Sequence, residues 1–185
     1  SIKGEGKTLV SSNIASLLSS TQKVILLGAD LRNPQIHKIL NVDRSTNGLT
    51  DILYKGDFTS YKDSLLKYDN LDILLSGTIP PNPGEILSSN LFKEFLSLLE
   101  KKYDYIIIDS APCLLVSDTF EISKYADFTM YIARANYSPN SIVQYINDCF
   151  KQEKLKNIKV VLNSIGNSTK YGYKYGYQYG YKYGY

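Results

Sequence analysis

The stretch SIKGEGKT (residues 1–8) decides how the rest of this sequence is interpreted. Gly4 and Gly6 allow the backbone N–H groups to turn inward around an anion, because neither residue carries a Cβ that would block the turn. Lys7 would then reach the β- and γ-phosphates of a nucleotide, and the hydroxyl of Thr8 would contact Mg²⁺. The apolar residues that follow recur at helical spacing, so the loop would open a helix whose N-terminus also attracts an anion.

This loop departs from the usual pattern at its first position, where Ser1 stands in place of a glycine. A glycine-rich turn without a ligand is therefore the alternative to a phosphate-binding loop, and the rest of the chain decides between them. A phosphate-binding loop normally follows a buried strand. We accordingly expect a first strand, and a further region of the protein, upstream of residue 1.

Composition limits the class of protein. The chain has 185 residues, of which 43% are hydrophobic, so one domain with its own core is expected. The net charge of +3 is too small to argue for a nucleic-acid partner or an acidic membrane surface. Cys113 and Cys149 lack metal-binding spacing and indicate reduced thiols in a cytosolic protein. No apolar run is long enough to span a bilayer, so we expect the chain itself to be soluble.

Apolar runs and amphipathic segments alternate along the chain. We predict strands at 23–30, 71–77, 105–112, 128–133 and 158–163. We predict helices at 9–20, 35–40, 47–53, 86–101, 118–125 and 138–153. This alternation is typical of an α/β fold with a mostly parallel sheet flanked by helices, and the opening loop indicates the P-loop NTPase type. We place this domain at residues 1–168.

Polar residues follow several of these strands, at the edge of the sheet where α/β proteins bind ligands. Asp109 ends a run of three isoleucines, and a carboxylate there would hold Mg²⁺; an exposed strand-end aspartate is the alternative. Asp30 could ligate the metal or orient a nucleophile. Arg32 could serve the same site or form a structural ion pair. Asn163 could contact a nucleobase or cap the turn, and the sequence does not choose between these roles.

The last 15 residues form a segment of a different kind. Their sequence, YGYKYGYQYGYKYGY (171–185), holds eight tyrosines and four glycines. The glycine content predicts a flexible tail, which we place at 169–185. Beside a nucleotide site these tyrosines suggest phosphoacceptors, and each phosphate would add about −1.5 to −2 charge. An aromatic surface that stacks on sugars or bases is the alternative.

Taken together, these segments resemble the catalytic domain of the bacterial tyrosine kinases (BY-kinases), the cytoplasmic part of polysaccharide co-polymerases. The resemblance covers nearly all 185 residues. The motifs that carry it are SIKGEGKT (Walker A), ILLGADLRNP (Walker A′), NGLTDIL, GTIPPNPGEIL, YDYIIIDSAP (Walker B), VVLN and the tyrosine cluster. The Walker A′ segment, the PPNP segment and the tail are more specific than a phosphate-binding loop alone.

The resemblance implies an ATP-dependent protein-tyrosine autokinase that uses Mg²⁺ and regulates polysaccharide polymerisation or export. It implies catalytic roles for Lys7, Asp30 and Asp109, and metal binding by Thr8 and the same two aspartates. The implied ATP-binding residues are Gly4, Glu5, Gly6, Lys7, Thr8, Leu9, Arg32 and Asn163, of which Asn163 matches the position that reads adenine. The implied phosphoacceptors are Tyr171, Tyr173, Tyr175, Tyr177, Tyr179, Tyr181, Tyr183 and Tyr185.

The resemblance also implies partners and a location. Other copies of the chain would form a ring, in which the tail of one subunit enters the site of its neighbour. A transmembrane co-polymerase or activator, fused upstream or separate, would hold the kinase at the cytoplasmic face of the membrane. No nucleic acid is expected among the partners.

Three features depart from the pattern of this family. Gly28 stands where many members carry the first acidic residue of Walker A′, so Asp30 would have to activate the tyrosine hydroxyl here. Ala111 replaces a common proline after Walker B, which should be tolerated. The oligomerisation helix of the family lies upstream of Walker A and is not part of this chain.

Two other functions compete with the kinase. A P-loop ATPase of the division and partition type would hydrolyse ATP and dimerise on it, but such proteins carry a lysine where this chain has Ile2. A nucleotide-binding scaffold would bind ATP without transferring phosphate. In that case Gly28 would mark lost catalysis, and another enzyme would phosphorylate the tail.

Overall fold

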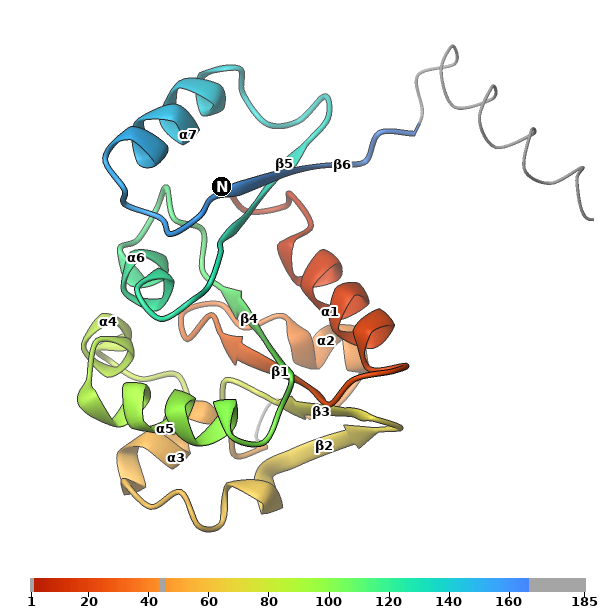
Figure 1. Ribbon diagram of the computed structural model, residues 1–185, viewed down its shortest axis with the longest axis vertical. Coiled ribbons are helices and arrows are strands. Elements are labelled where there is room, and N and C mark those ends of the chain that lie inside the picture. Colours follow the sequence, from red (N-terminus) through yellow and green to blue (C-terminus); the bar gives the residue numbers. More distant parts are fainter. Residues whose placement is uncertain (1, 44–45, 167–185) are drawn as a thin grey trace, which may run out of the picture.

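Four strands form the central sheet of the computed structural model, which describes residues 2–43 and 46–166 (Figure 1). In spatial order they are β2 (Leu65–Tyr68), β3 (Leu71–Leu74), β1 (Val24–Ala29) and β4 (Tyr105–Ser110). β1 pairs in parallel with both β3 and β4, and β2 pairs antiparallel with β3. All residues of β1 are buried, as a central strand covered on both faces requires. The predicted mostly parallel sheet is therefore confirmed.

Two further strands form a separate parallel pair, β5 (Met130–Arg134) and β6 (Lys159–Asn163). In Figure 1 this pair lies beyond the β4 end of the central sheet, and the N-terminal loop runs beside it. Within the described part of the chain no backbone pairing joins it to β4. Both strands lie where the sequence predicts them, within two residues at each end.

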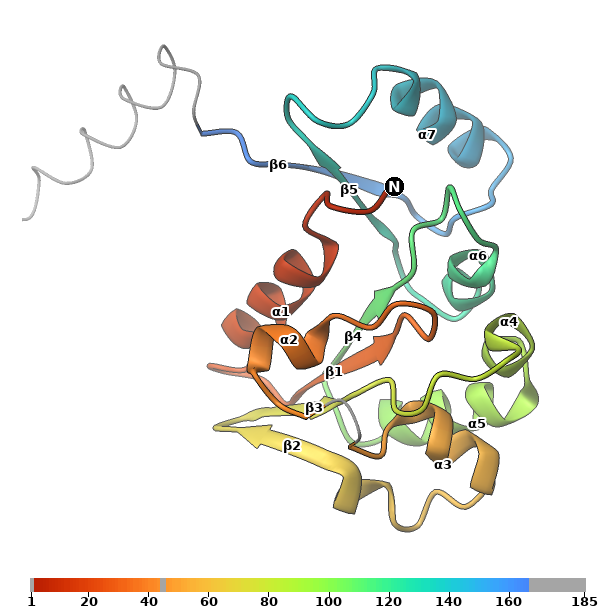
Figure 2. The ribbon, with the colours of Figure 1, turned by 180° about the vertical axis from the view of Figure 1, so that it is seen from behind.

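Helices cover both faces of the central sheet (Figure 2). They are α1 (Lys7–Leu18), α2 (Ile36–Leu40), α3 (Leu49–Lys55), α4 (Pro83–Leu87), α5 (Asn90–Glu100), α6 (Asp118–Ser123) and α7 (Ser141–Lys151), with a 3₁₀ turn, η1, at Tyr61–Ser64. Alternate residues of β1 face the two layers: Leu26 packs with α1 and α2, whereas Ile25 and Leu27 pack with α3 and α5. This arrangement leaves the carboxyl ends of β1 and β4 open toward the start of α1.

The prediction of one helix at 86–101 is wrong, because two helices occupy this region. α4 begins at Pro83, whose fixed φ suits the first helical turn. The chain then breaks at Ser88 and Ser89. The Oγ of Ser89 accepts a hydrogen bond from the backbone N–H of Phe92 at 3.2 Å and so caps a new helix, α5.

Two other points complete the comparison with the predicted elements. No helix in the described ranges is long and apolar enough to cross a membrane. The predicted tail at 169–185, its eight tyrosines and the domain boundary after residue 168 lie outside the residues that the structure describes. These three predictions therefore stay predictions.

Candidate functional site

The loop before α1 has the backbone that an anion site requires. Gly4 and Gly6 have φ values of 88° and 91°, in the left-handed region that favours glycine. α1 begins at Lys7, directly after Gly6, as predicted. A Cβ on Gly4 would lie 2.9 Å from the hydroxyl of Tyr137, and a Cβ on Gly6 would collide with the side-chain amide of Asn163. Both glycines are therefore required by conformation and by close neighbours.

Glu5 ties this loop to the second sheet. Its carboxylate is fully buried and accepts hydrogen bonds from the backbone N–H of Ile2 and from the hydroxyl of Ser138, each at 2.6 Å. Its backbone carbonyl accepts a hydrogen bond from Nδ2 of Asn163 at 2.9 Å. The side chain of Asn163 thus connects the end of β6 to the loop, and its contact with a nucleobase stays a prediction.

The segment between β5 and α7 also contacts the loop, and its residues were not predicted from the sequence. Arg134 donates from Nη1 to the carbonyl of Gly4 at 3.0 Å, and Tyr137 donates its hydroxyl to the carbonyl of Lys3 at 3.0 Å. The guanidinium of Arg134 lies 5.1 Å from the centre of the Tyr137 ring. Arg134 ends a strand, so the strand-end argument that selected Asp30 and Asp109 could have found it.

Lys7 lies at the start of α1, and its ammonium group contacts the loop that precedes this helix. Its Nζ donates to the carbonyl of Ile2 at 2.8 Å. Burial lowers the pKa of Lys7 below its ordinary value, while the charges of Glu5, Asp109 and Asp30 oppose that shift. Lys7 therefore shares an electrostatic environment with the two aspartates that end β1 and β4.

Asp109 is a buried carboxylate beside the first turn of α1. It is only 4% exposed, and burial raises its pKa to about 6, although hydrogen bonds from Thr8 and Ser11 lower it. The Ser11 hydroxyl lies 3.2 Å from Oδ1. Ser11 was not predicted, and only the helical spacing from Lys7 could have suggested it. The alternative of an exposed strand-end aspartate is excluded.

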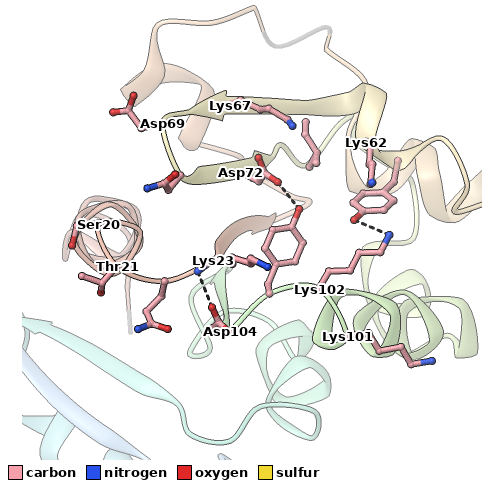
Figure 3. A pocket seen from close by; sticks show the side chains of 15 residues that line it. Ser20, Thr21, Lys23, Lys62, Lys67, Asp69, Asp72, Lys101, Lys102 and Asp104 are labelled. Atoms are coloured by element: carbon pink, nitrogen blue, oxygen red, sulfur yellow. Dashed lines mark hydrogen bonds between the residues drawn. The ribbon is translucent and has the colours of Figure 1, made fainter.

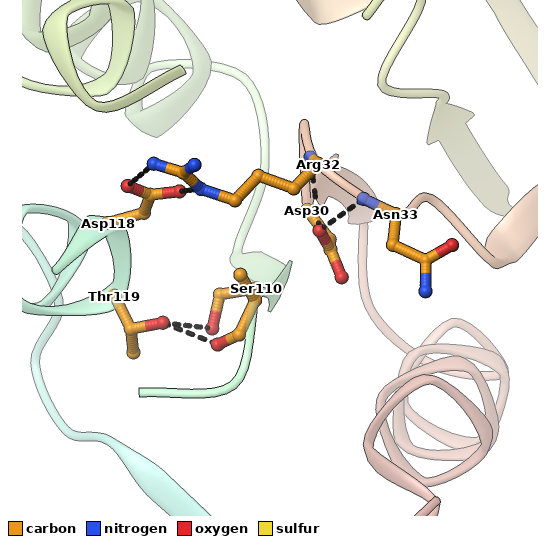
Figure 4. Close-up of polar contacts among 7 residues, drawn as sticks. Asp30, Arg32, Asn33, Ser110, Asp118 and Thr119 are labelled. Atoms are coloured by element: carbon orange, nitrogen blue, oxygen red, sulfur yellow. Dashed lines mark hydrogen bonds and ion pairs between the residues drawn. The ribbon is translucent and has the colours of Figure 1, made fainter. Parts of the chain in front are cut away.

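Asp30 and Arg32 belong to the turn after β1 (Figure 4). Oδ1 of Asp30 accepts hydrogen bonds from the backbone N–H groups of Arg32 and Asn33 at 3.2 and 2.9 Å. The side chain of Arg32 points away from Asp30, toward α6. Its guanidinium donates two hydrogen bonds to the carboxylate of Asp118, at 2.7 and 3.0 Å. The structural ion pair, one of the two predicted roles of Arg32, is thus present, and a contact of Arg32 with nucleotide stays a prediction.

Gly28 lies on β1 opposite Asp109 of β4 and faces the same side of the sheet. A Cβ built on Gly28 would lie 2.9 Å from the hydroxyl of Ser76 and 3.0 Å from its backbone nitrogen. The chain after β3 therefore occupies the space into which an acidic side chain at position 28 would extend. Of the two Walker A′ positions, only Asp30 supplies a carboxylate.

The residues present fit Mg-ATP. Hydroxyl and carboxylate oxygens are the ligands that Mg²⁺ takes, usually one or two from the protein with the rest from phosphates and water. Thr8, Asp30 and Asp109 supply such a set around Lys7. Burial raises the pKa of Asp109, and a cation bound beside it would favour its charged form.

The structure thus gathers most of the predicted site residues at one edge of the sheet. Lys7, Thr8, Asp30 and Asp109 lie together, and Glu5 and Asn163 flank the loop. Leu9 follows on α1, and its side chain is about half exposed.

Comparison with known proteins adds relatives of stated activity. No family model matches the chain. The tyrosine-protein kinase YwqD of Bacillus subtilis is 31% identical over 173 residues, which cover 92% of this chain and 73% of YwqD. The tyrosine-protein kinase ptk of Acinetobacter johnsonii is 36% identical over 165 residues, which cover 89% of this chain and 22% of ptk. The chain therefore spans about a fifth of the length of ptk and similar long relatives.

Solved structures agree with these relatives. The kinase domain of VpsO has a TM-score of 0.82 and 34% identity, over 89% of this chain and 81% of that domain. The kinase domain of Escherichia coli ETK has a TM-score of 0.75 and 26% identity, over 92% and 69%. MinD of Pyrococcus horikoshii, complexed with Mg-ADP, shares the fold at a TM-score of 0.67 and 22% identity, over 91% and 69%. The chain therefore belongs to the bacterial tyrosine-protein kinase family.

Proposed function

We propose that this chain is the catalytic domain of an ATP-dependent kinase that phosphorylates the tyrosines at 171–185 of another copy of itself. The observation that carries the proposal is the grouping of Lys7, Asp30 and Asp109 around a glycine loop. The same chain holds eight tyrosines in the segment 171–185. The named activity of the relatives supports it.

In this proposal the triphosphate of ATP lies along the loop. Backbone N–H groups of the loop and of the first turn of α1 bind its oxygens, and Lys7 exchanges its bond to the carbonyl of Ile2 for a phosphate oxygen. Asn163 has a second amide proton beyond the one it gives to Glu5, and this proton would read the adenine. Glu5 and Ser138 keep the loop in shape throughout.

Three residues would hold the metal and the acceptor. Thr8, Asp109 and Asp30 would bind Mg²⁺, which supplies positive charge against the phosphates when it is bound. Two backbone amides orient Asp30 through Oδ1, which leaves Oδ2 to accept the proton of the tyrosine hydroxyl. The tyrosine oxygen then bonds to the γ-phosphorus, the bond from that phosphorus to the bridging oxygen breaks, and ADP leaves, with Lys7 stabilising its charge.

We further propose the setting of this reaction. The relative from Klebsiella pneumoniae is named as a tyrosine-protein kinase in a cps region, which supports a role in polysaccharide polymerisation or export. A transmembrane co-polymerase, fused upstream or separate, would hold the domain at the cytoplasmic face of the membrane. A ring of identical subunits would bring each tail to a neighbouring site.

A labelled mixture tests the transfer between copies. A ¹⁵N-labelled Lys7→Met chain serves as acceptor and an unlabelled native chain as kinase, and both are incubated with Mg-ATP. We expect phosphate on the heavy chain, at the tail tyrosines, because transfer occurs between molecules. Phosphate confined to the light chain would contradict transfer in trans, and phosphate on neither chain would contradict the kinase.

A nucleotide-binding scaffold remains the second candidate function, and Gly28 is the observation that favours it. With no carboxylate at this position, one of the two Walker A′ acidic groups is missing. Tight binding of ATP without phosphate transfer by the native chain would support this candidate. For a P-loop ATPase of the division and partition type, the support is a likeness in fold alone, to solved structures that are 19–22% identical to this chain.

A further inference from the structure

A large hollow lies at the end of the central sheet opposite the nucleotide site. Figure 3 shows the side chains that line it. It has a volume of about 880 Å³. It is lined by residues that directly precede or begin three strands, among them Lys23 before β1, Asp72 in β3 and Asp104 before β4. Six-residue strands separate the two ends of the sheet by about 20 Å, at roughly 3.3 Å per residue. The hollow is therefore distinct from the site around Lys7.

Lysines dominate the charge of this hollow. Five of them line it: Lys23, Lys62, Lys67, Lys101 and Lys102. All five are exposed, and among the described residues none forms an ion pair. Of the three lining aspartates, Asp72 accepts a hydrogen bond from the hydroxyl of Tyr103 at 2.6 Å, and Asp104 accepts one from the backbone N–H of Lys23 at 2.9 Å. The lysine ammonium groups, apart from that of Lys102, are thus available to an anionic ligand.

Contacts among the lining residues hold part of the wall of this hollow in a fixed arrangement. Tyr61 is almost completely buried, and its hydroxyl accepts a hydrogen bond from Nζ of Lys102 at 3.3 Å. The same ammonium lies 4.7 Å from the centre of the Tyr61 ring, so two contacts orient this lysine. A second hollow of about 570 Å³ runs along α5, shares Lys101 and Lys102 and adds Lys93 and one acidic residue, Glu94. The basic surface is therefore elongated, which suits a chain with several anionic groups.

We propose that this groove binds the tail at 171–185 once its tyrosines are phosphorylated, an inference that rests on the proposed function. Each phosphate brings about −1.5 to −2 charge, and lysine binds phosphate as a point charge. The tail carries only two lysines of its own, Lys174 and Lys182, against eight tyrosines. Six lysines across the two hollows match several phosphates of one tail.

The reach of the chain allows this contact. β6 ends at Asn163, beside the loop that holds Glu5, so the chain leaves the described domain at the catalytic edge. The 19 residues from 167 to 185 span at most about 60–70 Å when extended, well beyond the length of the sheet. A phosphorylated tail held in the groove, of its own or of another copy, would be kept away from the catalytic site. The groove would thus hold phosphorylated tails and leave the catalytic site open to tails that are not yet phosphorylated.

A synthetic peptide tests the proposal without use of the enzyme. The peptide has the sequence 171–185 with four phosphotyrosines, and its affinity for phosphatase-treated full-length chain is measured by fluorescence anisotropy. We expect submillimolar binding that weakens with added salt, and at least about tenfold weaker binding of the unphosphorylated peptide. Because the peptide is made chemically, this result is independent of whether the chain phosphorylates itself.

Two matched variants locate the site. The triple variant Lys62→Gln, Lys67→Gln, Lys101→Gln should weaken phosphopeptide binding at least about tenfold. The control triple Lys151→Gln, Lys154→Gln, Lys156→Gln, on and after α7, removes the same charge and should bind as the native chain does. Asp69→Asn, which removes a negative charge from the rim at a residue with φ of 52°, a conformation that asparagine tolerates, should tighten binding about twofold to threefold.

The remaining outcomes overturn the proposal. An equal loss of phosphopeptide affinity in both triple variants would show that binding depends on the net charge of the chain and not on the groove. No phosphopeptide binding would exclude the tail as occupant. If the groove triple instead abolished sedimentation with phosphatidylglycerol vesicles and left phosphopeptide affinity unchanged, the groove would face a membrane. If the chain did not phosphorylate itself in Mg-ATP but still bound the phosphopeptide, the proposed function would be contradicted and the groove would stand as a phosphotyrosine-binding site.

Discussion

At the scale of single residues, the site concentrates charge where the protein shields it from water. Asp109 is 4% exposed, and its ordinary pKa near 4 is raised to about 6 by burial. Lys7 experiences the opposite displacement, because burial lowers its pKa while the neighbouring carboxylates raise it. Such displacements cluster at functional sites, because catalytic and ligand-binding groups must be partly removed from solvent.

Asp109 should therefore cost stability at neutral pH when no cation is bound. Its folded-state pKa lies above its unfolded value, so the folded state binds the extra proton and its stability falls as pH rises from about 4 to above 6. We expect Asp109→Asn to raise the free energy of unfolding at pH 7.5 in EDTA by about 2–3 kcal/mol. Urea titrations at pH 7.5 and pH 4 measure this, and the gain should largely vanish at pH 4. An equal gain at both pH values would contradict the assignment.

Arg32 and Asp118 should be coupled. Asp118 is 1% exposed in its side chain and depends on the 44%-exposed Arg32 for both of its ion-pair bonds. Removal of one partner leaves a buried charge, so we expect Arg32→Met to cost about 2–4 kcal/mol. In a double-mutant cycle with Asp118→Asn, the second substitution should cost much less once the first is made. Additive losses would show that the pair does not join α6 to the turn after β1.

The sequence predicted the charged centre of the site but not its supports. Lys7, Thr8, Asp30 and Asp109 were found because the loop pattern and the strand-end rule select those positions. The contacts of Tyr137 and Ser138 with the loop were not predicted, because both residues lie after the end of β5 and 133 or more residues separate them from their partners. No local pattern encodes such a pairing.

At the scale of secondary-structure elements, β1 and the chain after β3 approach unusually closely at Gly28. A Cβ there would meet Ser76 at 2.9 and 3.0 Å. We expect Gly28→Asp to destabilise the protein by about 1–3 kcal/mol, since the Ser76 hydroxyl must move and the Ser76 backbone must give way by a few tenths of an ångström. The control Gly166→Asp, where a Cβ would meet nothing within 4 Å, should change stability little.

A second substitution decides whether Ser76 is the obstacle. Ser76→Gly removes the hydroxyl that lies nearest to the added Cβ, so the double variant should recover part of the stability lost in Gly28→Asp. Thermal denaturation of the four chains measures this. A Gly28→Asp chain as stable as the native protein would show that the strand end moves freely, and that the missing carboxylate has another reason.

Most elements, but not all, could be predicted. Five strands and the alternation of the fold follow from continuous apolar runs, which are long enough to identify. β2 was missed because LLKY at 65–68 is short and lies at the edge of the sheet, where burial is incomplete. It joins β3 by a tight turn at Asp69, whose φ is 52°, and one positive-φ aspartate followed by asparagine is a weak signal in sequence alone.

At the scale of the whole molecule, the parallel sheet separates two charged regions. The carboxyl ends of β1 and β4 carry the aspartates and face the loop at Lys7, whereas the amino ends carry the lysine groove. The three parallel strands force this separation, because the carboxyl ends of β1, β3 and β4 meet at one edge. Phosphate would thus be transferred at one end of the molecule and recognised at the other.

Intact-mass measurement of the full-length chain after incubation with Mg-ATP tests the kinase most directly, with peptide mapping to locate any phosphate. The Lys7→Met chain is the control, and binding of a fluorescent ATP analogue is recorded for both. We predict a ladder of one to eight added phosphates confined to the peptide at 171–185, and none on the Lys7→Met chain. A native chain that binds nucleotide and gains no phosphate would contradict the kinase and favour the scaffold.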